Sequence, residues 1–168
     1  MSYTDNFTHA DDIVAHLNTV VPGLSDPLLQ AKYVGFVAVA AVTVYELAVK
    51  DILIGFGAKK HRVLGSFAES FFTRINGKIK VPVIKDDYVC RFGERYKTRF
   101  TVKLKKRAKA HLLSHRRDIL SSYGNIVTWR NDFAHKGRIH NLATYGEVVQ
   151  AYEDGKEVIH CLAETMTR

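Results

Sequence analysis

Cysteine is scarce in this sequence, since Cys90 and Cys161 are the only two among 168 residues. Their spacing gives neither a disulfide framework nor a zinc-binding pattern. A reduced, cytoplasmic protein is therefore the simplest interpretation. Residues 1–12 agree with it, because they are polar and acidic and lack the basic and then apolar order of a secretory signal.

The sequence also lacks an apolar run of membrane-spanning length. Its most apolar stretch, Val34–Val44, is closely followed by Glu46 and Lys50. A span requires about 20 apolar residues, so we expect this stretch to form a buried helix and the protein not to enter a membrane. Glycine-rich nucleotide-binding patterns and internal repeats are absent as well, and we expect no cofactor.

Acidic residues are outnumbered, with 17 Asp and Glu against 25 Lys and Arg and a formal net charge of +8. This balance favours a polyanionic partner. Most of the excess lies between Arg91 and Arg117, where Glu94 is the only acid. A solvated basic face is the alternative, but at this density we favour a phosphate-binding surface. The candidate residues for that surface are Arg99, Lys103, Lys105, Lys106, Arg107, Lys109, Arg116 and Arg117.

Metal-ligand clusters are a further absence. His111 and His115 are four residues apart, a spacing that could bind a metal, and His135 and His140 form a second pair. Neither pair is accompanied by carboxylates or thiolates in a recognisable metal-ligand pattern, as most zinc sites would require. We therefore expect no metal site, since a solvated basic helix explains the first pair equally well.

Apolar residues spaced by three and four positions recur along the chain and predict helices. We therefore predict an all-α fold, an up-and-down bundle of about five to six helices forming one domain over residues 1–168. Lys78–Ile84 is predicted to be an extended connector, and residues 138–141 a polar loop. The predicted helices are Thr8–Val21, Pro27–Gly57, Val63–Ile75, one that begins at Asp86 and Asp87, one from Asp118 to Gly137, and Thr144–Thr165, with a kink possible at Gly155.

The stretch from Thr128 to Gly137 contains the most suggestive chemistry. Arg130 can grip a phosphate with a forked set of donors, and histidine, present at His135, can both take and give a proton near pH 7. Five helical positions separate the two side chains by about 140° around the helix axis. They can converge only if the helix ends near Gly137 or if a second copy of the chain supplies the other residue. Trp129 fits a core or interface position better than a base-stacking one.

Arg130, Asn131 and His135 match a motif of the HEPN superfamily, which contains helical-bundle ribonucleases and nucleic-acid-associated domains. The chain resembles the RiboL-PSP and MAE-type HEPN proteins over roughly Ala31 to Leu162. The helix Val42–Leu53 is also similar to the family's earlier helix. The resemblance implies a symmetric homodimer in which the two motifs face each other across a cleft. The apolar stretch Val34–Val44 or the last helix could supply the dimer surface.

Membership would imply a metal-independent endoribonuclease with RNA as its partner. His135 would act on the ribose 2′-hydroxyl, Arg130 would neutralise charge on the transition state, and Asn131 would assist, leaving a 2′,3′-cyclic phosphate. Glu46 and Asp132 are supporting candidates, although a surface pair of Glu46 with Lys50 is the simpler interpretation. A toxin or phage-defence role with an antitoxin or sensor protein would follow.

Two alternatives remain open. The first is a non-catalytic HEPN-like module that binds nucleic acid or a protein, with Arg130 and His135 serving the structure. The second is a basic DNA-binding regulator, although no clear recognition-helix turn is present. The chain also departs from some HEPN toxins, because Lys136 and Gly137 follow His135 where those toxins carry a tyrosine two residues on. Control by a nucleotidyltransferase partner is therefore unsupported.

Overall fold

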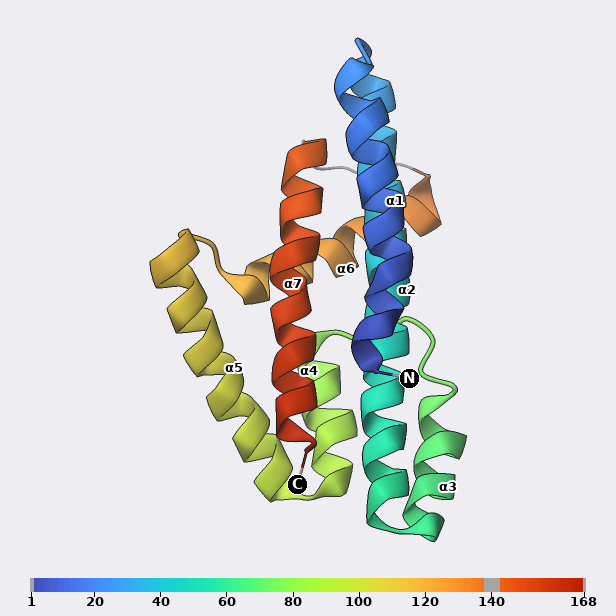
Figure 1. Ribbon diagram of the computed structural model, residues 1–168, viewed down its shortest axis with the longest axis vertical. Helices are drawn as coiled ribbons and strands as arrows, with labels where there is room; N and C mark the ends of the chain where they lie inside the picture. Colours follow the sequence, from blue (N-terminus) through green and yellow to red (C-terminus); the bar gives the residue numbers. More distant parts are fainter. Residues whose placement is uncertain (1, 138–142, 168) are drawn as a thin grey trace.

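The computed structural model describes residues 2–137 and 143–167. Within these residues the fold is all-α, without strands, as predicted (Figure 1). Its α-helices are α1 (Phe7–Val20), α2 (Pro27–Lys60), α3 (Arg62–Phe72), α4 (Val81–Val83), α5 (Glu94–His115), α6 (Ile119–Lys136) and α7 (Tyr145–Thr165). Short 3-10 turns cover Tyr3–Asn6, Val21–Gly23 and Val89–Phe92, and a π-helical turn covers Ile84–Tyr88.

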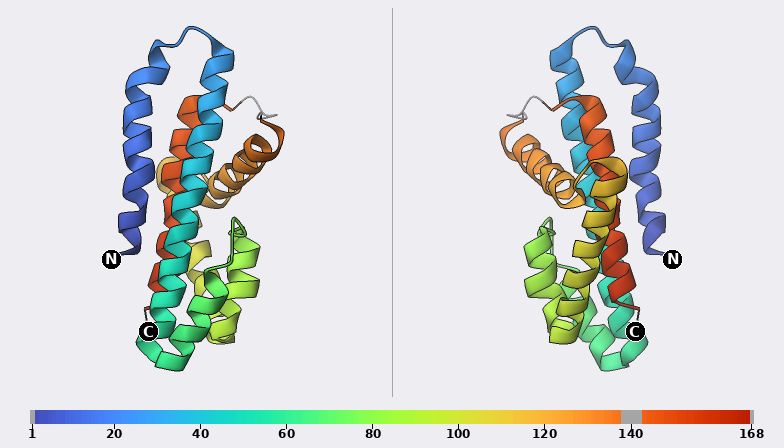
Figure 2. Two further views of the ribbon diagram at one scale, coloured as in Figure 1. Left: turned by 90° about the vertical axis from the view of Figure 1, so that its right-hand side faces the viewer. Right: turned by 90° about the vertical axis from the view of Figure 1, so that its left-hand side faces the viewer.

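Helix α2 is the centre of the bundle. It packs against α1, α3, α6 and α7, and Figure 2 shows α1 on one side of it with α6 and α4 on the other. Helices α1, α2 and α7 lie side by side along the long axis, as expected for an up-and-down bundle. Helix α6 differs, because it crosses obliquely behind α2 and α7 and so brings its C-terminal end to the opposite side from α5 (Figure 1).

Three tyrosines fasten α6 and α7 to this central helix. The Tyr45 ring of α2 is fully buried and stacks on Tyr123 of α6, with ring centroids 5.2 Å apart, and on Tyr152 of α7, at 5.8 Å. The Tyr45 hydroxyl donates a hydrogen bond to the Tyr152 carbonyl at 2.5 Å. It lies directly against Gly155, where a side chain would collide with it. Gly155 therefore accommodates a close contact within a continuous α7.

Helix boundaries follow capping residues that the sequence displays. Asp26 accepts a hydrogen bond from the Leu28 amide, and Pro27 opens α2. Asp118 caps α6 through the amides of Leu120 and Ser121, because its carboxylate satisfies donors that lack a helical partner. At the other end, Gly137 ends α6 in the left-handed conformation. The predicted limits of the motif-bearing helix are thus confirmed.

The segment after α3 differs from the prediction. Residues 78–80 are not helical, but helical structure begins at Val81, because Pro82 fits the first turn of a helix, where no amide donor is needed. The predicted helix start at Asp86 and Asp87 is also wrong, because these residues lie inside the helical run that begins at Val81. Gly93, with φ of +114°, then separates this helical run from α5.

Among the apolar residues of α5, Phe100 and Leu104 are buried, whereas Leu112 is 47% exposed and does not anchor the core. The loop predicted at 138–141 lies outside the described residues. No described helix is long and apolar enough to cross a membrane, because α2 carries charged side chains soon after its apolar stretch.

Candidate active site around Arg130

Arg130 is held above the segment that links α3 to α4. Its side chain is half-buried, and its guanidinium lies against Gly77, which has φ of +71°. A Cβ at Gly77 would lie 2.6 Å from the Nη2 atom of Arg130. Only glycine combines this backbone conformation with this close approach, so Gly77 forms the floor beneath the guanidinium.

Two hydrogen bonds fix that floor to the helices around it. The Gly77 amide donates to the Glu46 carboxylate of α2, and the Tyr123 hydroxyl of α6 donates to the Ile79 carbonyl at 2.8 Å. The other oxygen of Glu46 pairs with Lys50 at 2.7 Å, as predicted. Glu46 therefore supports Arg130 indirectly, because it holds the Gly77 backbone against which the guanidinium lies.

The neighbouring polar residues of the motif make local contacts. Arg130 donates to the side-chain carbonyl of Asn131 at 2.9 Å, and Asp132 pairs with Lys136 at 2.8 Å. Asn131 and Asp132 are partly exposed, and His135 is exposed. The imidazole is thus open to a substrate or a partner, and Asn131 orients the guanidinium rather than the imidazole.

Arg130 and His135 do not converge within one chain. Helix α6 stays regular through Lys136 and ends only at Gly137, so the two side chains keep the separation of about 140° that five helical positions impose. The helix does end at Gly137, as the sequence predicts, but His135 still lies in its last regular turn, so this end does not remove the separation.

Aromatic side chains surround the motif on its apolar side. Trp129 is buried, with 6% exposure, which confirms a core position. The Phe133 ring lies directly on Gly35 of α2 and packs on Phe36 with ring centroids 5.5 Å apart. The Phe36 ring itself is 54% exposed. An apolar surface thus continues from the motif onto α2.

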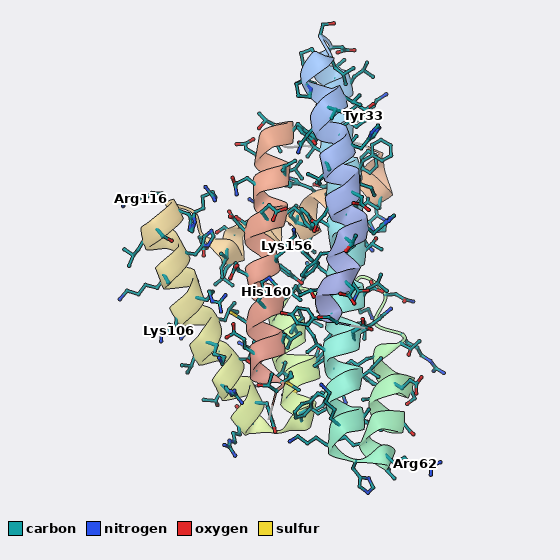
Figure 3. All side chains as sticks on the ribbon, viewed as in Figure 1. Tyr33, Arg62, Lys106, Arg116, Lys156 and His160 are labelled. Carbon is teal, nitrogen blue, oxygen red and sulfur yellow. The ribbon has the colours of Figure 1, made fainter. Side chains whose placement is uncertain are left out.

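The predicted basic surface divides into two faces. Four of its residues contact α7. Arg99 donates a hydrogen bond to the Glu164 carbonyl, and Lys103 and Arg107 form ion pairs with the Glu164 carboxylate. Arg107 also pairs with Glu157, and Arg117 pairs with Asp154. The other four, Lys105, Lys106, Lys109 and Arg116, are exposed. Figure 3 shows Lys106 and Arg116 at the outer edge of α5. The exposed face of α5 and the C-terminal end of α6, which carries the motif, lie on opposite sides of the bundle.

Asp154 forms a second polar cluster, which sequence analysis missed. It is 2% exposed and accepts hydrogen bonds from Arg117 at 2.8 Å, His111 at 3.0 Å and Ser122 at 3.2 Å. Burial raises the pKa of this carboxyl, but the bonds from Arg117 and His111 outweigh it and hold the pKa below its ordinary value. The cluster ties α5 and α6 to α7, so we interpret it as structural.

Among residues 2–137 and 143–167, no group of three or more His, Cys, Asp or Glu side chains could hold a metal ion. His111 and His115 stack on each other, with ring centroids 4.3 Å apart. His111 also bonds to Asp154. The two histidines thus contact each other and, through His111, the buried Asp154 carboxylate.

Gly77 is the site residue that the sequence did not reveal. In the sequence, Asn76-Gly77 indicates only the end of a helix. The pattern indicates a turn, but it cannot indicate that an arginine from a helix far along the chain lies on it. A tertiary contact of this kind leaves no local signal.

Comparison with known proteins bears on the family of the chain. Searches of curated proteins and of solved structures gave no match. The model of the RiboL-PSP-HEPN family, in contrast, matches residues 5–168. The matched residues include Ala31 to Leu162, over which the sequence resembles HEPN proteins, and with them the motif from Arg130 to His135. The chain therefore belongs to the RiboL-PSP-HEPN family.

Proposed function

We propose that this protein is a metal-independent endoribonuclease whose site is built around Arg130 and His135. The observation that carries the proposal is the placement of Arg130, whose guanidinium is fixed over Gly77 and oriented by Asn131. A held guanidinium stabilises charge that develops on a phosphate better than a mobile one does, because it reorganises less during the reaction.

The chemistry follows from the two side chains. His135 takes the proton of a ribose 2′-hydroxyl, whose oxygen then attacks the adjacent phosphorus. Arg130 neutralises the added negative charge, and the bond to the 5′-oxygen breaks as that oxygen receives a proton from a second histidine or from water. The products are a 2′,3′-cyclic phosphate and a 5′-hydroxyl end. DNA lacks the attacking hydroxyl and is not a substrate.

A homodimer completes the site in this proposal. The partner is a second copy of the chain, because Arg130 and His135 point apart in one copy and a two-fold axis supplies both residues from both sides. The exposed side of α2 offers the surface. Leu29, Phe36, Val39 and Leu47 form a stripe on it, with exposed fractions of 42%, 54%, 37% and 43%. Phe36 also touches Phe133 of α6, so the stripe adjoins the motif.

The biological role belongs to the same proposal. A toxin or phage-defence effector fits an RNA-cleaving member of this family, and such an enzyme requires an antitoxin or sensor protein that restrains it. The exposed lysines of α5, Lys105, Lys106 and Lys109, remain candidates for contact with distant parts of a long RNA.

A comparison of two substrates tests the proposal. Wild-type protein is incubated with single-stranded RNA and with DNA of the same sequence, in excess chelator. We expect cleavage of the RNA alone, and a loss of at least 100-fold in Arg130→Ala and His135→Ala proteins whose thermal unfolding is unchanged. Cleavage that survives both substitutions would remove the assigned site. RNA binding without cleavage would instead support the non-catalytic module.

A further inference from the structure

A cleft of about 540 Å³ lies between α3 and the helical run that follows α4. Figure 2 shows these two elements side by side, with the end of α6 above them. One wall is the face of α3 that carries Phe67 and Phe71, together with Arg74 just after the end of the helix. The other carries Val83, Asp87 and Arg91, which recur every four positions. The cleft is thus formed by two facing helical surfaces.

The cleft is basic. Arg74, Lys78 and Arg91 line it together with a single carboxylate, that of Asp87. Within the described part of the chain, none of the three cations lies within 4.0 Å of an acidic group, whereas four cations of α5 are held by α7. The positive charge of the cleft is therefore available to an anionic ligand.

The cleft is also aromatic. Phe67 is 54% exposed, and the Arg91 guanidinium lies over the Phe71 ring, 4.2 Å from its centroid. The Tyr88 hydroxyl donates to the Lys78 carbonyl at 2.7 Å, which fixes the end of the cleft. The exposed Phe67 ring, beside cations that lack an acidic partner, suits a nucleotide, because bases stack on aromatic faces and phosphates pair with arginine and lysine.

The position of the cleft relates it to Arg130. Ile75 and Lys78 line its end, and between them lies Gly77, which carries the Arg130 guanidinium. A strand whose scissile phosphate rests on Arg130 can therefore pass over Lys78 directly into the cleft. The exposed face of α5 offers no such continuity, because it lies on the opposite side of the bundle.

We infer that this cleft binds single-stranded RNA beyond the two nucleotides that flank the scissile phosphate, with Phe67 stacking on a base and Arg74, Lys78 and Arg91 binding phosphate. The inference rests on the proposed ribonuclease function and deepens it. It places substrate recognition on the face formed by α3 and α4.

Binding is measured first, without cleavage. The probe is a fluorescent single-stranded RNA with 2′-O-methyl groups, which lack the attacking hydroxyl, and the readout is anisotropy. We expect Arg74→Glu to weaken binding at least tenfold and to lower the salt dependence by about one phosphate contact. Phe67→Ala should weaken it roughly five- to tenfold by removing a stacking platform. Lys78→Glu serves as a second charge reversal, should Arg74→Glu unfold.

Matched controls on α3 separate the cleft from general charge. Arg62→Glu makes the same charge change at the N-terminal end of α3, at the lower right of Figure 3, and Arg62 does not line the cleft. Val63→Ala removes an apolar side chain that is 70% exposed and does not line the cleft. Both controls should bind within twofold of wild type. Equal weakening by Arg62→Glu and Arg74→Glu, or unchanged binding by Phe67→Ala, overturns the inference, as does a wild-type protein that does not bind the probe.

Cleavage separates failure of the cleft from failure of the enzyme. A dinucleotide contains the scissile phosphate but no residue to enter the cleft, so Arg74→Glu and wild type should cleave it equally, while Arg74→Glu cleaves a long RNA at raised KM. If wild type cleaves neither substrate, the ribonuclease proposal fails, and the binding measurement still decides whether the cleft takes RNA. A dinucleotide rate that falls as much as the long-RNA rate counts against the cleft.

Discussion

At the scale of single residues, Gly77 connects the backbone to the chemistry of Arg130. Its left-handed conformation and its contact with the guanidinium are two separate reasons why a side chain is excluded there. Glu46 adds a third restraint through the Gly77 amide. A change at Gly77 should therefore affect both stability and catalysis, and the two effects can be measured separately.

We predict that Gly77→Ala lowers the free energy of unfolding by about 1–2 kcal/mol, because alanine is strained at positive φ. Cleavage of RNA should fall roughly 10- to 100-fold, because the new Cβ displaces the guanidinium. Gly93→Ala is the matched control, since Gly93 also has positive φ but a Cβ added there would meet no atom within 4 Å. It should lose stability and keep its cleavage rate. Equal rate losses in both variants would contradict a role for the contact with Arg130.

At the scale of helices, the boundaries of α6 could be predicted because their causes are local. Asp118 caps its start, and Gly137 ends it in the left-handed conformation. The segment from Val81 to Phe92 could not be predicted, since proline is compatible both with an extended connector and with a first helical turn. The sequence also could not show which basic residues around α5 form ion pairs. Arg107 and Arg117 are indistinguishable in the sequence from the exposed lysines, because their partners Glu157 and Asp154 lie far along the chain on α7.

The junction of α5, α6 and α7 depends on Asp154. We predict that Asp154→Asn lowers the free energy of unfolding at pH 7 by roughly 3 kcal/mol, because it leaves Arg117 and the largely buried His111 without an anionic acceptor. Because the pKa of Asp154 is lowered in the folded protein, its stabilisation is complete above about pH 4 and is lost as pH falls through the folded-state pKa. Denaturant unfolding at several pH values measures this.

The control for that measurement is Glu153→Gln, which changes an adjacent carboxylate that is 49% exposed and pairs with Lys156. It should cost about 0.5 kcal/mol or less. The difference between wild type and Asp154→Asn should shrink below about pH 4. A difference that is absent at pH 7, or that does not change with pH, would show that the cluster does not stabilise the junction.

At the scale of the whole molecule, the account depends on the association of two copies. We predict that wild type has twice the mass of the chain in solution and that Phe36→Glu yields a folded monomer without cleavage activity, because a charge would be buried in the apolar stripe. Val102→Glu is the matched control, since Val102 is 61% exposed on α5, away from the stripe. Light scattering should find Val102→Glu dimeric. A wild-type monomer, or a cleaving Phe36→Glu monomer, would exclude the shared site.

The most direct test of the ribonuclease account is the chemical identity of the RNA ends. Wild-type protein is incubated with a single-stranded RNA in excess chelator, and the fragments are analysed by mass spectrometry. The account predicts 2′,3′-cyclic phosphate and 5′-hydroxyl ends, because the attacking oxygen comes from the RNA itself. These ends should be absent with His135→Ala. Fragments with 5′-phosphate ends, or unchanged cyclic ends with His135→Ala, would contradict the account.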